Sequence, residues 1–183
     1  VGSSAASDVY KRQVLQQARG ARISMLDSMN LWIEIARDDL LAVMKSVDLI
    51  IINDGEVRML AEDDNLIRAS RQLIGMVGCQ TLIIKKGENG VLAFHGDDMI
   101  ALPAYPTENV VDPTGCGDSF AGTIAACLAA NNGPISKSEL RDALIRATVT
   151  ASFTLESFGT SGLIGLTLEK FKLRLAQFEE ILS

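Results

Sequence analysis

Short apolar runs alternate with longer helical segments through the first half of the chain, and this alternation constrains the fold more than any other feature. The clearest run is LIII at residues 49–52. The pattern predicts strands at residues 22–26, 49–52 and 81–84, with helices at residues 31–45 and 65–76 between them. Strands that alternate with helices form βαβ crossovers, which require parallel strands. We therefore expect an α/β fold with a mostly parallel sheet.

The second half of the chain follows a different order. Residues 90–95 and 99–102, joined by residues 96–98, predict an antiparallel hairpin. Three helices are expected after the hairpin, at residues 118–130, 136–155 and 168–182. The last helix carries an apolar stripe that we expect to pack on the sheet, and it consists of Leu168, Phe171, Leu175, Phe178 and Leu182.

Composition and charge exclude several classes of protein. The chain has 183 residues, enough for one domain with a real core, and 48% of them are apolar, so disorder is not expected. The net charge of −6 has the wrong sign for a protein that binds the phosphates of nucleic acids. No apolar run reaches the roughly 18 residues of a membrane helix. From the charge we therefore expect no nucleic acid as partner, and from the short apolar runs we expect no membrane.

The cysteines and the histidine indicate the compartment rather than a metal site. Cys79, Cys116 and Cys127 are an odd number without C-x-x-C spacing, and His95 is the one histidine. We expect Cys127 to pack in a helix, Cys79 to lie at a strand edge and His95 to be exposed in the hairpin. Free cysteines are typical of a reducing compartment, so we expect a cytoplasmic protein.

Residues 109–121, NVVDPTGCGDSFA, place glycines and acids at the start of a predicted helix. Helix N-termini carry unpaired N–H groups and a positive dipole end, so Gly115 and Gly117 favour an anion site, with phosphate as the natural anion. Asp118 would repel phosphate unless it accepts a proton from an attacking hydroxyl. The alternative is that Asp118 and Ser119 only cap the helix. The spacing fits neither the Walker nor the Rossmann glycine pattern.

This stretch resembles the C-terminal signature of the ribokinase-like, or PfkB-type, carbohydrate kinases, usually written D-[TP]-T-G-A-G-D-[ST]-F. Here the signature reads DPTGCGDSF. Other segments follow in the order of that family: DSMN at residues 27–30, NDGE at residues 53–56, KKGENG at residues 85–90, and residues 147–162. The main departure is Cys116, where the family usually has alanine. A small side chain should be tolerated there because the loop uses its backbone.

The resemblance implies a ribokinase-like three-layer αβα sandwich and an ATP-dependent phosphotransferase. The acceptor would be a primary alcohol of a sugar or nucleoside, in a ribokinase-like or adenosine-kinase-like enzyme. Asp118 would be the catalytic base, and the backbone N–H groups of Gly115, Cys116 and Gly117 would form the anion hole. Glu56 would organise Mg²⁺ through water.

The resemblance also implies the remaining site residues. The nucleotide site would be built from Asn53, Glu56, Lys85, Gly87, Gly90, Thr114, Gly159 and Gly162. Asp112, together with Thr114, matches positions where several relatives bind a monovalent cation, so K⁺ is a further expected ion. Asp27 and Asn30 resemble a D-x-x-N variant that lies near the transferred phosphate.

Each of these motifs has an ordinary structural interpretation as well. Residues 53–56 are typical of a helix cap with an acid in the first turn. Lys85 and Lys86 are typical of solvated lysines at a strand end. Residues 27–30 would suit an Asx turn, and residues 159–162 a plain loop between helices.

The first thirteen residues, VGSSAASDVYKRQ, lack the periodicity of a helix or strand and the pattern of a signal peptide. Residues 3–13 resemble the translation of an adapter oligonucleotide used in sequencing libraries. We therefore expect residues 1–13 to be an unstructured artefact and residues 14–183 to be the C-terminal portion of a kinase domain. Relatives carry earlier strands and a β lid that contacts the sugar. We expect the chain without them to be inactive by itself, and the resemblance allows a homodimer formed through that lid.

Two other functions compete with the kinase hypothesis. Cys116 stands at a helix N-terminus, where the pKa of a thiol falls, so it could be the nucleophile of a hydrolase. His95 lies in the predicted hairpin, and no third catalytic member is evident. The third hypothesis is a non-catalytic, truncated fragment.

Overall fold

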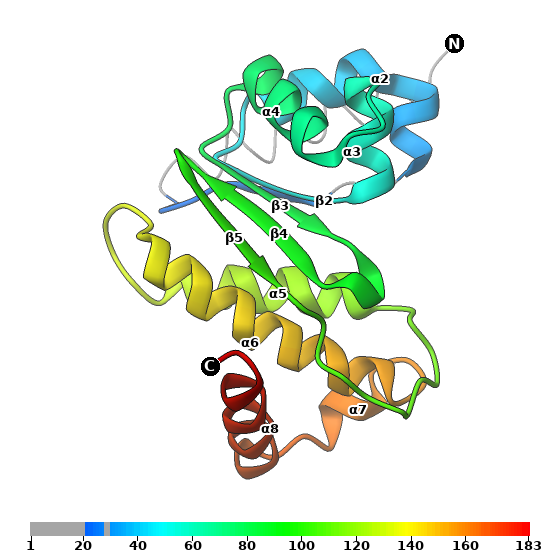
Figure 1. The fold of residues 1–183 in the computed structure, drawn as a ribbon, viewed down its shortest axis with the longest axis vertical. Helices are drawn as coiled ribbons and strands as arrows, with labels where there is room; N and C mark the ends of the chain where they lie inside the picture. The colour runs from blue at the N-terminus through cyan, green and yellow to red at the C-terminus, as the bar shows by residue number, and fades with distance from the viewer. Residues whose placement is uncertain (1–20, 28–29) are drawn as a thin grey trace. The chain divides into compact units, whose positions relative to one another are not determined.

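The computed structural model describes residues 21–27 and 30–183, except the side chains of residues 30–32 and 34–36 (Figure 1). The predicted artefact at residues 1–13 lies outside this range. The described chain divides into two compact units: unit 1 comprises residues 21–27, 30–86 and 93–99, and unit 2 comprises residues 87–92 and 100–183. The described residues include no helix that is long and apolar enough to cross a membrane.

Unit 1 is built on three parallel strands, as the alternating pattern predicts. They are β1 (Met25–Asp27), β2 (Leu49–Asn53) and β3 (Thr81–Lys85). Asp27 pairs with Ile51, and Asn53 pairs with Lys85, so the three strands end at the same edge of the sheet. The first four residues of β2 and of β3 are buried, which explains why both strands are apolar on both faces.

Three helices complete unit 1: α2 (Asn30–Met44), α3 (Asp54–Ala61) and α4 (Leu66–Val77). Helix α4 begins after the Asn65 cap and ends at Gly78, which adopts the left-handed conformation. Helix α3 was not among the predicted helices, although the alternative interpretation of residues 53–56 as a helix cap implies a helix start there. It has eight residues and starts directly after β2, so the sequence offers too little periodicity to reveal it.

The predicted hairpin is present as β4 (Val91–His95) and β5 (Asp98–Leu102), joined by two residues rather than three. The Gly96 N–H donates to the Gln80 carbonyl, and the Thr81 hydroxyl contacts the His95 ring at 2.8 Å. These contacts put the end of β4 beside the start of β3, so the two strands are antiparallel. The sheet order is β1-β2-β3-β4-β5, and the sheet is therefore mixed.

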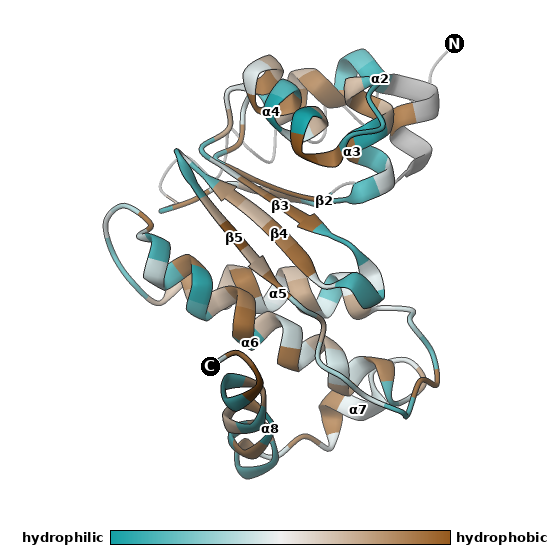
Figure 2. Cartoon of the chain, viewed as in Figure 1, coloured by the Kyte–Doolittle hydropathy of each residue, from teal (hydrophilic) through white to brown (hydrophobic). Residues whose placement is uncertain are grey.

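Unit 2 contains one 3₁₀ turn, η1 (Gly87–Asn89), and the helices α5 (Cys116–Ala129), α6 (Lys137–Leu155), α7 (Ser161–Ile164) and α8 (Leu168–Ile181). Helix α6 is the central element, because α5, α7 and α8 all pack against it. Its buried residues include Leu140, Leu144 and Ala147. Figure 2 shows mostly brown strands and a mixed teal and brown helix α8, as expected for buried strands and a surface helix.

Helix α8 departs from the sequence prediction in two respects. Its main partner is α6 rather than the sheet. Phe178 is fully buried, whereas Leu168 is 67% exposed, so Leu168 does not belong to the buried stripe. Leu168 is the first residue of the helix and lies almost one turn before Phe171, the first stripe residue that is even half-buried.

Candidate functional site

The NDGE motif joins β2 directly to α3 in unit 1. Asn53 is the N-cap of α3, and its side-chain oxygen accepts a hydrogen bond from the Glu56 N–H at 2.8 Å. In return, Oε2 of Glu56 accepts a hydrogen bond from the Asn53 N–H at 2.9 Å. This reciprocal pair is a capping box. The structural interpretation of residues 53–56 as a helix cap is therefore correct.

The capping box uses only Oε2 of the Glu56 carboxylate and leaves Oε1 unexplained. The residue is 1% exposed, and its Oε1 atom is buried without a hydrogen-bond partner among the residues that the structure describes. Burial raises the pKa of the Glu56 carboxyl, although the Asn53 N–H and the nearby Lys85 oppose that rise. A buried carboxylate oxygen without a partner is costly unless a ligand, water or ion satisfies it.

Lys85 lies beside this carboxylate at the end of β3. Its Nζ forms an ion pair with Oδ1 of Asp27 at 2.8 Å, and both side chains are less than one third exposed. Lys85 is therefore not a freely solvated lysine, and Asp27 is held by an ion pair. The side chain of Asn30, the other residue of the predicted D-x-x-N motif, lies outside the part of the chain that the structure describes.

Together these residues make a charged cluster in unit 1, formed by Asp27, Asn53, Glu56 and Lys85. The parallel register places them at the carboxyl ends of β1, β2 and β3, where ligands bind in open α/β sheets. Nowhere in residues 21–27 and 30–183 do three or more His, Cys, Asp or Glu side chains gather at metal-binding spacing. A cation held by few carboxylates and several waters is the kind that this cluster suits, and Mg²⁺ has that preference.

The glycine motif in unit 2 forms the start of helix α5, as predicted. Gly115 is the N-cap and has φ of 83°, a conformation that favours glycine. The first intrahelical bond runs from the Ser119 N–H to the Gly115 carbonyl. Within the described part of the chain, the N–H groups of Gly115 and Gly117 have no acceptor. The Cys116 N–H differs, because it donates to the Pro113 carbonyl at 3.2 Å.

Asp118 lies in the first turn of α5, and its side chain is exposed. It makes no hydrogen bond or ion pair with any described residue, and the helix has no side-chain cap. Ser119 instead contacts its own helix and α6, since its hydroxyl donates to the Cys116 carbonyl and accepts from Thr154 Oγ1 at 2.9 Å. The alternative that Asp118 caps α5 is therefore wrong.

The thiol of Cys116 points toward α6 and donates to the Ala151 carbonyl at 3.6 Å. Its pKa is raised, chiefly by burial and also by the negative charge of Asp112. The sequence argument for a hydrolase expected a lowered pKa at the helix N-terminus. Here burial outweighs the helix dipole, so the nucleophilic thiolate is disfavoured. His95, the histidine of that hypothesis, lies at the end of β4 with its ring on Thr81.

Asp112 and Thr114 form a local turn just before the predicted anion loop, residues 115–117. Oδ1 of Asp112 accepts a hydrogen bond from the Thr114 N–H at 2.9 Å. Hydrogen bonds from Thr114 lower the pKa of the Asp112 carboxyl, so it stays ionised. An ionised carboxylate can serve as one ligand of a monovalent cation.

The four other predicted glycines divide into two kinds. A Cβ on Gly90 would collide with the Leu102 carbonyl, and a Cβ on Gly162 would collide with the Phe153 carbonyl, so packing requires both glycines. Gly87 and Gly159 have φ of 56° and 57°, and the space where a side chain would lie is open. Only the second pair leaves room for a ligand against the backbone.

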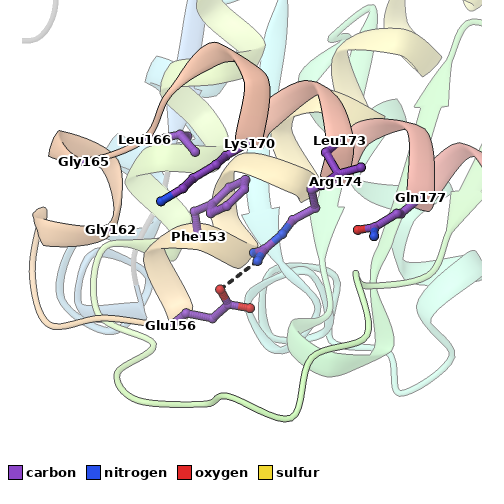
Figure 3. Close-up of a pocket in the computed structure, with 9 residues that line it drawn as sticks. All are labelled: Phe153, Glu156, Gly162, Gly165, Leu166, Lys170, Leu173, Arg174 and Gln177. Atoms are coloured by element: carbon purple, nitrogen blue, oxygen red, sulfur yellow. Dashed lines mark hydrogen bonds and ion pairs between the residues drawn. The ribbon is translucent and has the colours of Figure 1, made fainter.

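Sequence reasoning missed a group of side chains around a cavity of about 380 Å³ between α6, α7 and α8 (Figure 3). Glu156 and Arg174 form an ion pair there, with Oε2 of Glu156 lying 2.9 Å from the Arg174 guanidinium. Phe153 covers one side of that guanidinium, 3.7 Å from its ring centre. No short motif marks these residues, because they come from three separate helices and the residues next to them.

Comparison with protein families gives a match over most of the chain. A model of the family described as "pfkB family carbohydrate kinase" matches residues 3–164. A cytidine kinase from Thermococcus kodakarensis is 38% identical over 92 residues, which are 49% of this chain and 32% of that protein. Fructokinase-2 from Oryza sativa subsp. japonica is 31% identical over 112 residues, 61% of this chain and 33% of that protein. The chain thus spans about one third of the length of these relatives.

Solved structures bear out the predicted fold. An E. coli protein described as ribokinase II, in complex with ATP and Mg²⁺, superposes with a TM-score of 0.73 at 23% identity. The superposition covers 91% of this chain and 53% of that protein. The expected ribokinase-like αβα fold is confirmed.

Proposed function

Because the chain belongs to the pfkB family of carbohydrate kinases, we propose that the protein which carries it transfers a phosphoryl group from ATP to a primary alcohol. The acceptor is a sugar or a nucleoside, since the similar relatives include a fructokinase and a cytidine kinase. ATP as the donor is supported by the similar structure that was solved with ATP and Mg²⁺.

The observation that carries the proposal is the state of Asp118. It is exposed, and within the described residues it has no hydrogen-bond or ion-pair partner, although it stands beside backbone N–H groups that attract anions. Its structural contribution is therefore limited to its interaction with the helix dipole, worth about 0.3–1 kcal/mol. An acid that accepts a proton from a substrate hydroxyl needs to be unpaired and accessible.

The chemistry follows from these groups. The substrate hydroxyl oxygen attacks the γ-phosphorus of ATP, its proton passes to Asp118, and the bond to the β-phosphate oxygen breaks to release ADP. The N–H groups of Gly115 and Gly117 stabilise the negative charge of the transferred group. The Cys116 N–H contributes less than the sequence suggested, because the Pro113 carbonyl already accepts its hydrogen bond.

Glu56 fits the role of organising Mg²⁺. Its Oε1 atom is buried without a partner, and a metal-bound water would satisfy it. When bound, Mg²⁺ neutralises phosphate charge. Lys85 adds a positive charge at the end of β3, and its ion pair with Asp27 holds it there. Asp112 supplies an ionised carboxylate for K⁺, beside Thr114.

The test is Asp118→Asn in the intact protein that carries this sequence. We expect kcat to fall by about two to four orders of magnitude, the usual contribution of a general base. The melting temperature should change by no more than about 4 °C, because Asp118 makes no hydrogen bond or ion pair and the substitution loses only its interaction with the helix dipole. Asp142→Asn, on the exposed face of α6, is the matched control and should keep full activity. If Asp118→Asn retains activity within tenfold of the wild type at equal stability, Asp118 is not the base.

A further inference from the structure

The chain between β5 and the anion loop, residues 103–112, contains no helix or strand. This segment nevertheless determines where Gly115 and Asp118 lie, because it leads directly into them. A segment without its own secondary structure takes its position from contacts with other elements. Tyr105 in this segment contacts Phe178 and Gln177 of α8, and two further contacts lie nearer to the anion loop.

The first contact is the end of helix α6. The N–H groups of Val111 and Asp112 both donate to the Leu155 carbonyl, at 2.9 and 3.2 Å. Leu155 is the last residue of α6, so its carbonyl has no partner within the helix. The preceding turn of α6 also contacts the anion loop, through the hydrogen bonds from Thr154 to Ser119 and from Cys116 to Ala151.

The second contact is a chain of hydrogen bonds that reaches helix α8. The Thr107 hydroxyl donates to Oε1 of Glu156 at 2.7 Å. Oε2 of Glu156 accepts a hydrogen bond from Arg174 at 2.9 Å. Glu156 therefore joins the segment to α8, and its two oxygens are both used.

Arg174 is itself held from several sides. It donates to the Ser152 hydroxyl at 3.0 Å, and its guanidinium lies 3.7 Å from the Phe153 ring centre and 5.0 Å from that of Tyr105. Figure 3 shows the guanidinium reaching from α8 past Phe153 to Glu156. The Arg174 and Glu156 side chains are 18% and 20% exposed, so their interaction is partly desolvated.

We propose that Arg174 is a positioning residue for the anion loop, acting through Glu156 and Thr107. The role lies outside the part of the chain that the family model matches, because that match ends at residue 164 and α8 begins at Leu168. In this role α8 is a brace: it fixes the Glu156 carboxylate, which fixes Thr107 and the segment that leads to Asp118. The kinetic consequence rests on the proposed kinase function, whereas the structural consequence does not.

The structural test measures hydrogen exchange at the Val111 and Asp112 amides in the 183-residue chain. Arg174→Met removes the charge and keeps a long apolar stem. We expect it to accelerate exchange at these two amides by about tenfold, because the segment opens locally more often. Lys170→Met is the matched control, since Lys170 lies one turn earlier on α8 and forms no ion pair with the described residues. Unchanged protection of both amides in Arg174→Met would overturn the proposal.

A second variant keeps the test decisive if Arg174→Met fails to fold. Thr107→Val removes the hydroxyl that donates to Glu156 and accepts from the Asn109 N–H, and it leaves the Glu156–Arg174 pair in place. We expect it to accelerate exchange at the same amides, with little change in melting temperature. Normal exchange in Thr107→Val would contradict the path through Glu156.

The functional test uses the intact protein. Displacement of a catalytic group by about 1 Å can lower the rate by about a hundredfold, so Arg174→Met and Thr107→Val should each lower kcat by about tenfold or more. Arg174→Lys, which keeps the charge, should restore part of kcat. The double variant should lose no more than the worse single variant, since both act on one path. Fully additive losses would refute the shared path, and a wild type without kinase activity would refute the proposed function but not the exchange result.

Discussion

Phe178 offers a quantitative test of how helix α8 is attached to unit 2. The side chain is completely buried, and its ring packs edge-on against Tyr105 with 5.7 Å between the ring centres. Phe178→Ala loses about 2–3 kcal/mol of hydrophobic transfer free energy. The cavity left behind brings the total cost to about 3–5 kcal/mol. Loss of the aromatic pair, worth about 0.5–1.5 kcal/mol, favours the upper part of that range.

Thermal unfolding followed by circular dichroism is the appropriate assay. For a chain of this length each kcal/mol corresponds to about 2–4 °C, so the melting temperature should fall by about 10 °C. Phe158→Ala is the control because Phe158 is 71% exposed, and we expect it to cost less than about 0.5 kcal/mol. A cost below about 1 kcal/mol for Phe178→Ala would refute the docking of α8 through this side chain.

Two further substitutions examine the predicted site. Burial raises the pKa of Glu56 above its ordinary 4.5, so the folded chain holds this proton more tightly than the unfolded chain, and the resulting stability is lost as pH rises through the folded pKa. Glu56→Gln should therefore gain stability relative to the wild type between pH 4 and neutral pH, measured by urea unfolding. A difference in the free energy of unfolding that stays constant over this pH range would contradict the raised pKa of Glu56. Cys116→Ala should keep kinase activity in the intact protein within about threefold, because the loop acts through its backbone. Loss of activity in a direct phosphorylation assay would contradict this and would support a catalytic role for the Cys116 thiol.

Local patterns in the sequence predicted most of the secondary structure. The apolar runs located β2 and β3, and their alternation with helices indicated the parallel pairing of β1, β2 and β3. The glycines located the start of α5 to within two residues, since a helix start needs its special residues at fixed offsets. The extent of the short helix α3 was not predicted, because eight residues contain barely two turns of periodic pattern.

The site was predicted less completely, because its charges depend on their surroundings. The sequence indicated a lowered pKa for the Cys116 thiol, since a helix N-terminus favours the thiolate. The structure buries that thiol against α6 and places Asp112 near it, and both effects raise the pKa. Likewise, the capping role of Glu56 was readable from the spacing, whereas its buried and unpartnered Oε1 was not.

The sequence by itself thus determined most of the elements, the glycine loop at the start of α5 and the resemblance to sugar and nucleoside kinases, because each depends on residues close together along the chain. Tertiary structure alone decided which distant side chains meet. Lys85 and Asp27 are 58 residues apart, and Thr107 and Glu156 are 49 apart. No periodicity connects such residues. Their pairing follows from the register of the parallel strands in unit 1 and from the packing of α6 and α8 in unit 2, which only the folded chain defines.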